Sequence, residues 1–401
     1  MDHCPFDFET VVPRRGSGAY KWDAQPPVQG LEEGADIIPM WVADMDFRTA
    51  PCIIEALQRR VGHGVFGYTQ VPGSYYQAVR DWFSRRHGWV IDPSWILYTS
   101  GVVPAISATI KALTVPGDQV IVQTPVYNCF FSSIRNNGCI RTESPLLYEH
   151  HTYRMDFEDL ERKCADPKAK ILLLCNPHNP AGRVWTQEEL ARTGEICRRH
   201  GVIVVSDEIH CELTLPGHTF TSFAAASKEN QGCSITLNSP SKSFNTAGLQ
   251  IANIITDNPS WRERIDRAIN INEVCDVNPF GVIALQAAYS PEGEAWLEAL
   301  RDRIYKNYLI LKDLFEKEAP DFPLCRLEGT YLVWVDCSAL GDIASEAVEK
   351  SLIERERVWI NAGSMYGQEG FIRINIACPE TLLREGTRRI IHGLNRLLQN
   401  K

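Results

Sequence analysis

Three polar residues follow short apolar runs, at places where their side chains could act together. Asn179, Asp207 and Lys242 each come within a few residues of the end of such a run. The runs are KILLLC, VIVVS and SITL, at 170–175, 202–206 and 234–237. Short, almost continuous apolar runs are typical of strands in a parallel sheet covered by helices on both faces. Ligands of such sheets bind at the carboxyl ends of the strands, so we expect the three side chains to face one crevice.

An acid, an amide and a lysine in one crevice can hold pyridoxal phosphate. This cofactor needs a lysine amine for its Schiff base, a carboxylate beside its pyridine nitrogen, and a donor to its phenolic oxygen. Lys242, Asp207 and Asn179 would supply these three groups. Each residue also has a simpler interpretation, because a lysine after a strand is usually solvated, Asp207 could cap a helix, and Asn-Pro pairs favour turns. Their convergence favours the cofactor.

The phosphate of this cofactor needs a site of its own. The stretch TSGVVPA at 99–105 precedes an apolar helical pattern, and Pro104 suits the first turn of a helix. We expect the free backbone N–H groups at Gly101, Val102 and Val103, together with the helix dipole, to bind phosphate. A plain turn capped by Ser100 is the alternative. The hydroxyls of Ser239 and Ser241, beside Lys242, are further candidate donors.

One arginine is a candidate for binding a substrate carboxylate. In the run FIRINIA at 371–377, the isoleucines at 372, 374 and 376 share one face of a strand, and Arg373 shares the other face with Asn375. An arginine fork matches a carboxylate at two points, which a lysine cannot do. The alternative is an arginine on a solvated strand face.

The elements that must position these residues follow from the same pattern. Further apolar runs at 119–123 and 251–256 also predict strands, and helical patterns at 104–115 and 186–200 lie between strands. Thr186 and Glu189 have the spacing of a capping box. Alternation of this kind predicts an α/β fold with a mostly parallel central sheet.

A second, smaller α+β domain is predicted after residue 290. A long helix at 294–318 is followed by strand patterns at 330–336 and 371–377, with a helix at 344–355 between them. We therefore divide the chain into a segment at 1–50 that belongs to the small domain, a large cofactor-binding domain at 51–290, and the small domain at 291–401.

Composition excludes several other classes of protein. The chain has 401 residues and a formal net charge of −9, without a basic run, so a nucleic-acid or anionic-membrane surface is not expected. We find neither a signal peptide nor a run of about 20 apolar residues that could span a membrane. The 13 cysteines are scattered, without the spacing of a disulfide framework or a zinc site. We expect a cytoplasmic enzyme without a metal.

The motifs together resemble a known superfamily. The stretches that carry this resemblance are YTQVPG, SGVVPA, NPHNPAGRVWT, SDEIH, SPSKSFNTAG and FIRINIACP. The chain resembles the fold type I pyridoxal-phosphate aminotransferases over almost its whole length. Within this superfamily, the chain is most similar to the carbon–sulfur β-lyases of the MalY/PatB group, of cystathionine β-lyase type. The motifs that carry this similarity are PMWVADMDF, HGVFGY, GVVPA and SDEIHCEL.

The resemblance implies a role for each matching residue. Lys242 would form the Schiff base and act as the catalytic base, Asp207 would pair with the pyridinium, and Asn179 would donate to the phenolic oxygen. Arg373 would bind the substrate carboxylate, and Tyr127 would lie against the cofactor ring.

Two further positions bear on assembly and on the type of reaction. Tyr68 resembles a tyrosine that reaches the phosphate of the neighbouring subunit, which implies a homodimer with shared active sites. His210 stands where many aminotransferases have a tyrosine, and the lyase group also has a histidine there. It is a further residue expected near the cofactor ring.

The resemblance implies β-elimination from L-cystathionine or cysteine S-conjugates, which gives thiol, pyruvate and ammonia. Two alternatives stay open at this point. One is an aminotransferase that uses a keto-acid acceptor. The other is a regulatory protein that binds a partner and retains residual cofactor activity.

Overall fold

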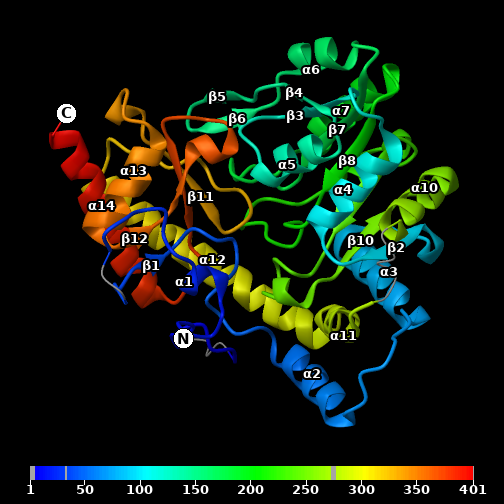
Figure 1. Cartoon of the computed structure of the whole chain (residues 1–401), viewed down its shortest axis with the longest axis horizontal. Coiled ribbons are helices and arrows are strands. Elements are labelled where there is room, and N and C mark those ends of the chain that lie inside the picture. The colour runs from blue at the N-terminus through cyan, green and yellow to red at the C-terminus, as the bar shows by residue number, and fades with distance from the viewer. Residues whose placement is uncertain (1–4, 32–33, 272–276, 401) are drawn as a thin grey trace.

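A large mixed sheet forms the centre of the bigger part of the protein (Figure 1). The structure, a computed structural model, describes residues 5–31, 34–271 and 277–400. Within them, seven strands pair in the order β2-β10-β9-β8-β7-β3-β4. These are β2 (Ile96–Thr99), β10 (Ala252–Ile255), β9 (Ser234–Asn238), β8 (Ile203–Asp207), β7 (Ala169–Cys175), β3 (Gln119–Val122) and β4 (Ile140–Glu143). Pairing is parallel from β9 to β4, whereas β10 is antiparallel to both of its neighbours.

Each of the five apolar runs that predicted strands forms a strand of this sheet. In β7, Ile171 and Leu173 pack on one face while Leu172 and Leu174 pack on the other, and none is more than 1% exposed. Both faces of this strand are therefore buried, which is why its sequence is almost continuously apolar.

Helices cover both faces of the sheet. The face of Ile171 and Leu173 packs against α4 (Val102–Leu113), α5 (Asn128–Asn136) and α10 (Pro259–Asn270). The opposite face packs against α6 (Phe157–Cys164), α7 (Gln187–Arg199) and α8 (Phe223–Ala226), with α9 (Lys228–Gln231) next to α8. A small hairpin of β5 (Leu147–Glu149) and β6 (Thr152–Arg154) lies beyond the sheet.

The predicted capping box at the start of α7 is confirmed. The Glu189 backbone N–H donates to the hydroxyl of Thr186 (3.2 Å), and the Thr186 backbone N–H donates to the Glu189 carboxylate (2.9 Å). Two of the N–H groups that a helix leaves unpaired at its start are satisfied in this way.

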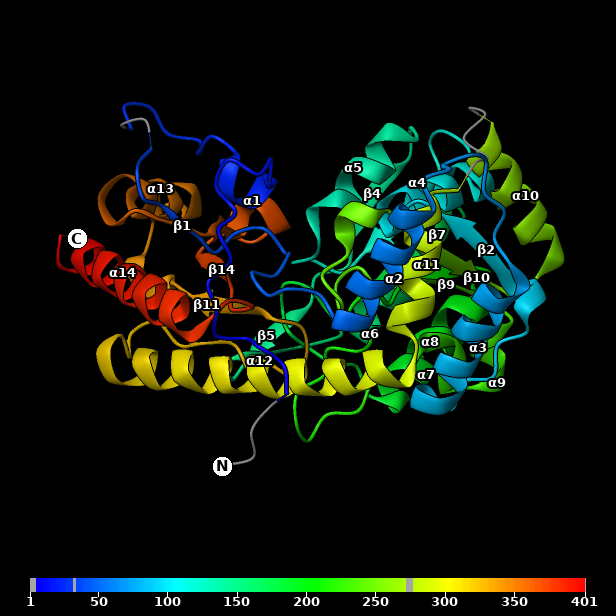
Figure 2. The same ribbon diagram turned by 90° about the horizontal axis from the view of Figure 1, so that it is seen from below.

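One long helix connects the two parts of the protein. Helix α12 (Pro291–Glu318), predicted at 294–318, runs along the lower edge of the view in Figure 2 and lies beneath both parts. The smaller part contains an antiparallel sheet in the order β11-β14-β13, formed by Leu332–Asp336, Phe371–Asn375 and Asn361–Ala362. Helix α13 (Ser345–Ser351), which continues as a π-helical turn at Leu352–Glu356, and helix α14 (Glu380–Gln399) complete it.

The N-terminal segment lies against this smaller part. It contains α1 (Tyr20–Asp23) and β1 (Ile38–Pro39), and β1 pairs in parallel with β12 (Val358–Trp359). Helices α2 (Pro51–His63) and α3 (Gly73–His87) then return the chain to the large part, where both pack against α11 (Pro279–Ala288). The fold class predicted from the sequence, an α/β protein with a mostly parallel central sheet and a smaller α+β part, is confirmed.

Within residues 5–31, 34–271 and 277–400, no helix has both the length and the apolar character of a membrane span.

Candidate active site

A cavity of about 500 Å³ lies where the strands of the large sheet end. Asn179 follows β7, Asp207 ends β8 and Lys242 follows β9. All three line the cavity, and Arg373 reaches it from β14 of the smaller part. A cavity of this size suits a cofactor together with a small substrate. The convergence expected from the sequence is therefore present in the fold.

Asp207 is a buried acid with few partners. It is the last residue of β8 and is 4% exposed, and its Oδ1 accepts a hydrogen bond from the Ile209 backbone N–H at 3.1 Å. Burial raises the pKa of its carboxyl group to about 7, although that N–H and the charge of Lys242 act in the opposite direction. A positive group placed beside Asp207 would offset the burial and keep the carboxylate ionised.

Lys242 carries an amine whose pKa is lowered. Its Nζ donates to the carbonyl of Ala43 at 2.7 Å. Burial, followed by the nearby charge of Arg373, lowers the pKa of the amine below its ordinary value. The amine therefore loses its proton more readily than a lysine in water, as a base or nucleophile requires.

Ser239 and Ser241 occupy the turn that carries Lys242. The Ser239 hydroxyl donates to the carbonyl of Ile251 (2.6 Å) and accepts from the backbone N–H of Ser241 (3.0 Å), so it shapes the turn. Ser241 lines the cavity, whereas Ser239 is buried and is not part of the cavity wall.

Arg373 is held on three sides. Its Nη1 donates to Oδ1 of Asn179 (3.1 Å), its Nη2 donates to the carbonyl of Trp41 (2.6 Å), and its guanidinium lies 4.9 Å from the centre of the Tyr366 ring. Each terminal nitrogen carries a second N–H, so the fork keeps donors for a carboxylate. The isoleucines at 372, 374 and 376 pack into the main core, and Arg373 lines the cavity on the opposite face of β14, as the alternation predicted.

The start of α4 presents backbone donors to the cavity. Gly101 precedes the helix, and the first N–H to bond within it is that of Ala105, which donates to the carbonyl of Gly101 (3.0 Å). The N–H groups of Gly101, Val102 and Val103 precede that bond, so they are the donors that a helix start leaves free. All three residues line the cavity.

Tyr127 and His210 also line the cavity. Tyr127 lies between β3 and α5, and burial raises the pKa of its phenol. His210 is buried, and burial together with the charges of Lys242 and Arg373 lowers the pKa of its imidazole to about 3. His210 is therefore neutral near pH 7. Among the described residues, its Nδ1 has no hydrogen-bond partner.

Tyr68 stands apart from the other predicted residues. It lies between α2 and α3, is 94% exposed, and is not part of the cavity wall within this chain.

The structure adds a loop to the site that residue types alone did not assign. Trp41, Val42 and Ala43 line the cavity, and two of their backbone carbonyls accept hydrogen bonds from Arg373 and Lys242. The motif PMWVADMDF marked this stretch as part of the resemblance. A backbone carbonyl has no residue-type signature, however, so its role became visible only in the fold.

The chemistry of this donor set fits pyridoxal phosphate. Asp207 is a buried acid to which no cation of the described residues donates a hydrogen bond. Lys242 is an amine with a lowered pKa, and α4 begins with free N–H groups. Asn179 can donate through its side-chain amide nitrogen, because its oxygen already accepts from Arg373. These are the groups that the cofactor requires.

Comparison with known proteins gives consistent results. Residues 35–390 match the family model described as aminotransferase class I and II. The chain is 41% identical to cystathionine beta-lyase PatB of Bacillus subtilis over 391 residues, 97% of this chain and 100% of the relative. It is 36% identical to protein MalY of Escherichia coli over 395 residues, 97% of this chain and 99% of that protein.

A solved structure agrees with these relatives. The structure of cystalysin from Treponema denticola, which contains a pyridoxal 5'-phosphate cofactor, superposes with a TM-score of 0.92 at 36% identity. The match covers 98% of this chain and 99% of that one.

Proposed function

The chain belongs to the aminotransferase class I and II family, and from this premise we propose that it is a pyridoxal-phosphate-dependent carbon–sulfur lyase. Its reaction is β-elimination from L-cystathionine or another cysteine S-conjugate, in which substrate and water give thiol, pyruvate and ammonia. The observation that carries this proposal is the meeting of Lys242, Asp207, Asn179 and Arg373 around one cavity.

Each of these side chains has a distinct task. When bound, pyridoxal phosphate supplies an electron sink that stabilises negative charge on Cα of the substrate. Asp207 would hold a positive charge beside the ring nitrogen, Asn179 would donate to the ring oxygen, and the start of α4 would hold the phosphate. Tyr127 and His210 would lie near the ring, and Ser241 would add a hydroxyl beside Lys242.

Arg373 and Lys242 act on the substrate. Arg373 grips the α-carboxylate at two points and thereby fixes the direction of the Cα–H bond. Lys242 removes the Cα proton through its Nζ, for which its lowered pKa suits it. The C–S bond at Cβ then breaks, and the electron pair leaves with the thiolate. No oxidant and no second amino-group acceptor is needed.

We also propose a homodimer in the cytoplasm, with Tyr68 reaching the partner's phosphate site. Tyr68 and its neighbours in the chain Val61, Val65 and Phe66 are all exposed, and apolar side chains exposed together are typical of an interface. The cysteines among the described residues are free, as is usual in a reducing compartment.

Product release separates a lyase from an aminotransferase. S-methyl-L-cysteine should give pyruvate, ammonia and thiol in equal amounts without added keto acid, whereas L-alanine, which lacks a leaving group, should not turn over. Lys242→Ala should abolish release. Arg373→Lys should lower kcat/KM by roughly tenfold to a hundredfold, because a point charge cannot make the two-point contact. Brisk turnover of alanine with a keto acid, without pyruvate from S-conjugates, would overturn the proposal.

A further inference from the structure

The loop at 41–46 presents a row of backbone carbonyls to the active site. The Trp41 carbonyl accepts from Arg373 (2.6 Å), and the Ala43 carbonyl accepts from Lys242 (2.7 Å) and from the hydroxyl of Tyr331 (3.0 Å). The carbonyls of Val42 and Asp44 both accept from Asn375 (2.5 Å and 2.7 Å), which shares the face of Arg373 on β14. The position of this loop therefore determines where the Lys242 amine and the Arg373 fork lie.

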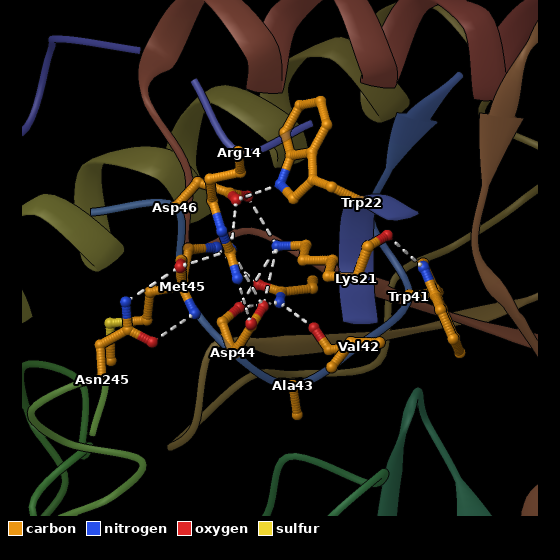
Figure 3. Close-up of polar contacts among 12 residues, drawn as sticks. Arg14, Lys21, Trp22, Trp41, Val42, Ala43, Asp44, Met45, Asp46 and Asn245 are labelled. Carbon is orange, nitrogen blue, oxygen red and sulfur yellow. Dashed lines mark hydrogen bonds and ion pairs between the residues drawn. The ribbon is translucent and has the colours of Figure 1, made fainter. Parts of the chain in front are cut away.

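A buried ionic cluster holds the far side of the loop (Figure 3). The Lys21 side chain is fully buried, and its Nζ lies 2.6 Å from Oδ2 of Asp46 and 3.7 Å from Oδ1 of Asp44. Arg14 bonds both acids, at 2.6 Å to Asp44 and 2.8 Å to Asp46. The indole N–H of Trp22 donates to Oδ1 of Asp46 (2.7 Å).

The same residues also bind the loop backbone. The Nζ of Lys21 donates to the Asp44 carbonyl (3.3 Å), and the Lys21 carbonyl accepts from the indole N–H of Trp41 (3.1 Å). Figure 3 shows Lys21 between Trp41 and Asp46, with hydrogen bonds toward both ends of the loop. Two cations and two acids thus form a balanced set around a segment that has no helix or strand to fix it.

Burial makes this balance important. Although burial alone would raise the pKa of the Asp46 carboxyl group, the charge of Lys21 and hydrogen bonds from Lys21, Trp22 and Arg14 lower it. Removing one partner of a buried ion pair leaves a charge that the interior does not solvate, so nearby segments shift to bring in water or another partner. Here the segment next to such a charge is the loop that holds Arg373.

We propose that Lys21 is a positioning residue for substrate binding. Its ion pair with Asp46 fixes the loop at 41–46, and the Trp41 carbonyl then fixes the fork of Arg373 in the orientation that accepts an α-carboxylate. Lys21 does not contact the substrate. The inference rests on the proposed function in one respect, the role of Arg373 as the carboxylate-binding group.

The first test is hydrogen exchange in the cofactor-loaded protein. Lys21→Met keeps the length of the side chain and removes its charge. Exchange at the amides of Met45 and Asp46, which donate to Asn245 (3.0 Å) and Ala377 (2.9 Å), should be roughly tenfold faster or more in this variant. The matched control is Arg396→Met, which breaks a partly buried pair with Glu356 in the smaller part, away from the loop. It should leave exchange at 45–46 unchanged.

The second test separates positioning from loss of stability. In Lys21→Met, kcat/KM for S-methyl-L-cysteine should fall roughly tenfold or more, while inhibition by S-methylcysteamine, which lacks the carboxylate, should keep its constant. A purely structural defect would weaken both ligands alike. Arg396→Met should change neither kcat/KM for S-methyl-L-cysteine nor the inhibition constant of S-methylcysteamine.

A charge-balanced variant covers the case in which Lys21→Met folds poorly. Lys21→Met/Asp46→Asn removes one charge of each sign, and the side-chain amide oxygen introduced at position 46 can still accept from Trp22 and Arg14. This double variant should recover slow exchange and most of the lost kcat/KM, a non-additive outcome that defines coupling between the two residues.

Three results would overturn the inference: unchanged exchange at 45–46 in Lys21→Met, equal weakening of both ligands, or additive losses in the double variant. The exchange arm needs no turnover. If no S-conjugate released pyruvate, the proposed function would fail, while exchange would still decide whether Lys21 holds the loop.

Discussion

Two buried acids follow one another at the end of β8 and differ in what surrounds them. Burial raises the pKa of both Asp207 and Glu208 to about 7. Oε1 of Glu208 accepts from the Ser206 hydroxyl (2.8 Å) and the Phe223 backbone N–H (2.8 Å), whereas Asp207 faces the cavity. Glu208 is therefore a structural acid, and Asp207 is the one available to a bound cofactor.

This difference makes a matched pair of variants possible. Asp207→Ala should lower kcat by roughly a hundredfold to a thousandfold, because the developing charge loses its electrostatic support. Steady-state kinetics at saturating cofactor measures this effect. Glu208→Gln keeps the size of the buried side chain next door and should retain most of kcat per folded molecule. Near-normal turnover by Asp207→Ala would show that Asp207 only shapes the end of the strand.

The raised pKa of Asp207 also predicts a pH dependence in the cofactor-free protein. Between about pH 4 and pH 7, the folded state keeps a proton on Asp207 that the unfolded chain has lost, so this group's contribution to stability falls as pH rises. His178 and His210, whose pKa values burial lowers to about 3, act in the opposite direction below about pH 6.5. The contribution of Asp207 must therefore be isolated by difference.

Asp207→Asn provides that difference. Urea unfolding at pH 5 and pH 8 should show the wild-type protein losing stability relative to the variant as pH rises. Added cofactor should reduce the loss, because a positive partner lowers the pKa of Asp207. A constant difference between the two proteins across this range would contradict the assignment.

At the scale of elements, the predictions succeeded where burial acts on both faces of a strand. The sequences of β7, β8 and β9 are almost continuously apolar because helices cover both sides of these strands, so all three could be predicted. The strands that no run predicted, β2 and β4, are the outermost strands of the sheet. In β4, Ile140 and Arg141 are exposed and Thr142 and Glu143 are half-buried, so its composition does not differ from that of a loop.

The residues of the candidate site also differ in whether the sequence could predict them. Residues that follow buried strands could be named from the sequence because topology brings such strand ends together. The loop at 41–46 could not, since its contribution is a set of carbonyls whose direction depends on Lys21 and Asp46, partners 25 residues apart. The hydrogen bond of Ser239 to the backbone could not be predicted either, because a hydroxyl donates to backbone or ligand with the same ease.

The cap of α7 can be tested in isolation. Thr186→Ala removes one half of the capping box and should lower the free energy of unfolding by about 1 kcal/mol. Thermal or urea denaturation measures this change. Kinetics per folded molecule should be unaffected, since Thr186 does not line the cavity. Glu188→Ala, an exposed change in the same turn, is the control and should have a smaller effect.

At the scale of the whole molecule, the active site joins the two parts of the chain. The large sheet supplies Asn179, Asp207 and Lys242, while the smaller part supplies Arg373 and the loop that supports it. A movement of one part against the other would therefore change carboxylate binding and cofactor binding by different amounts. Helix α12, which lies beneath both parts, is the element that most directly couples them (Figure 2).

Tyr68 extends this argument to a second copy of the chain. It is 94% exposed and is not part of its own cavity wall, so a role at a phosphate requires the site of a neighbour. Mixing Lys242→Ala with Tyr68→Phe tests this role. In a mixed dimer with shared sites, one site carries both lesions and the other carries neither. After random exchange, about one site in four should be wild type, and activity should rise above the mean of the two parents.

Subunit exchange is verified by native mass spectrometry, and Lys242→Ala mixed with Arg373→Lys is the control. These two residues line the same cavity of one chain, so mixing them should restore no wild-type site and should give only the mean. Activity at the mean in both mixtures would show that each cavity works without Tyr68 of a neighbour.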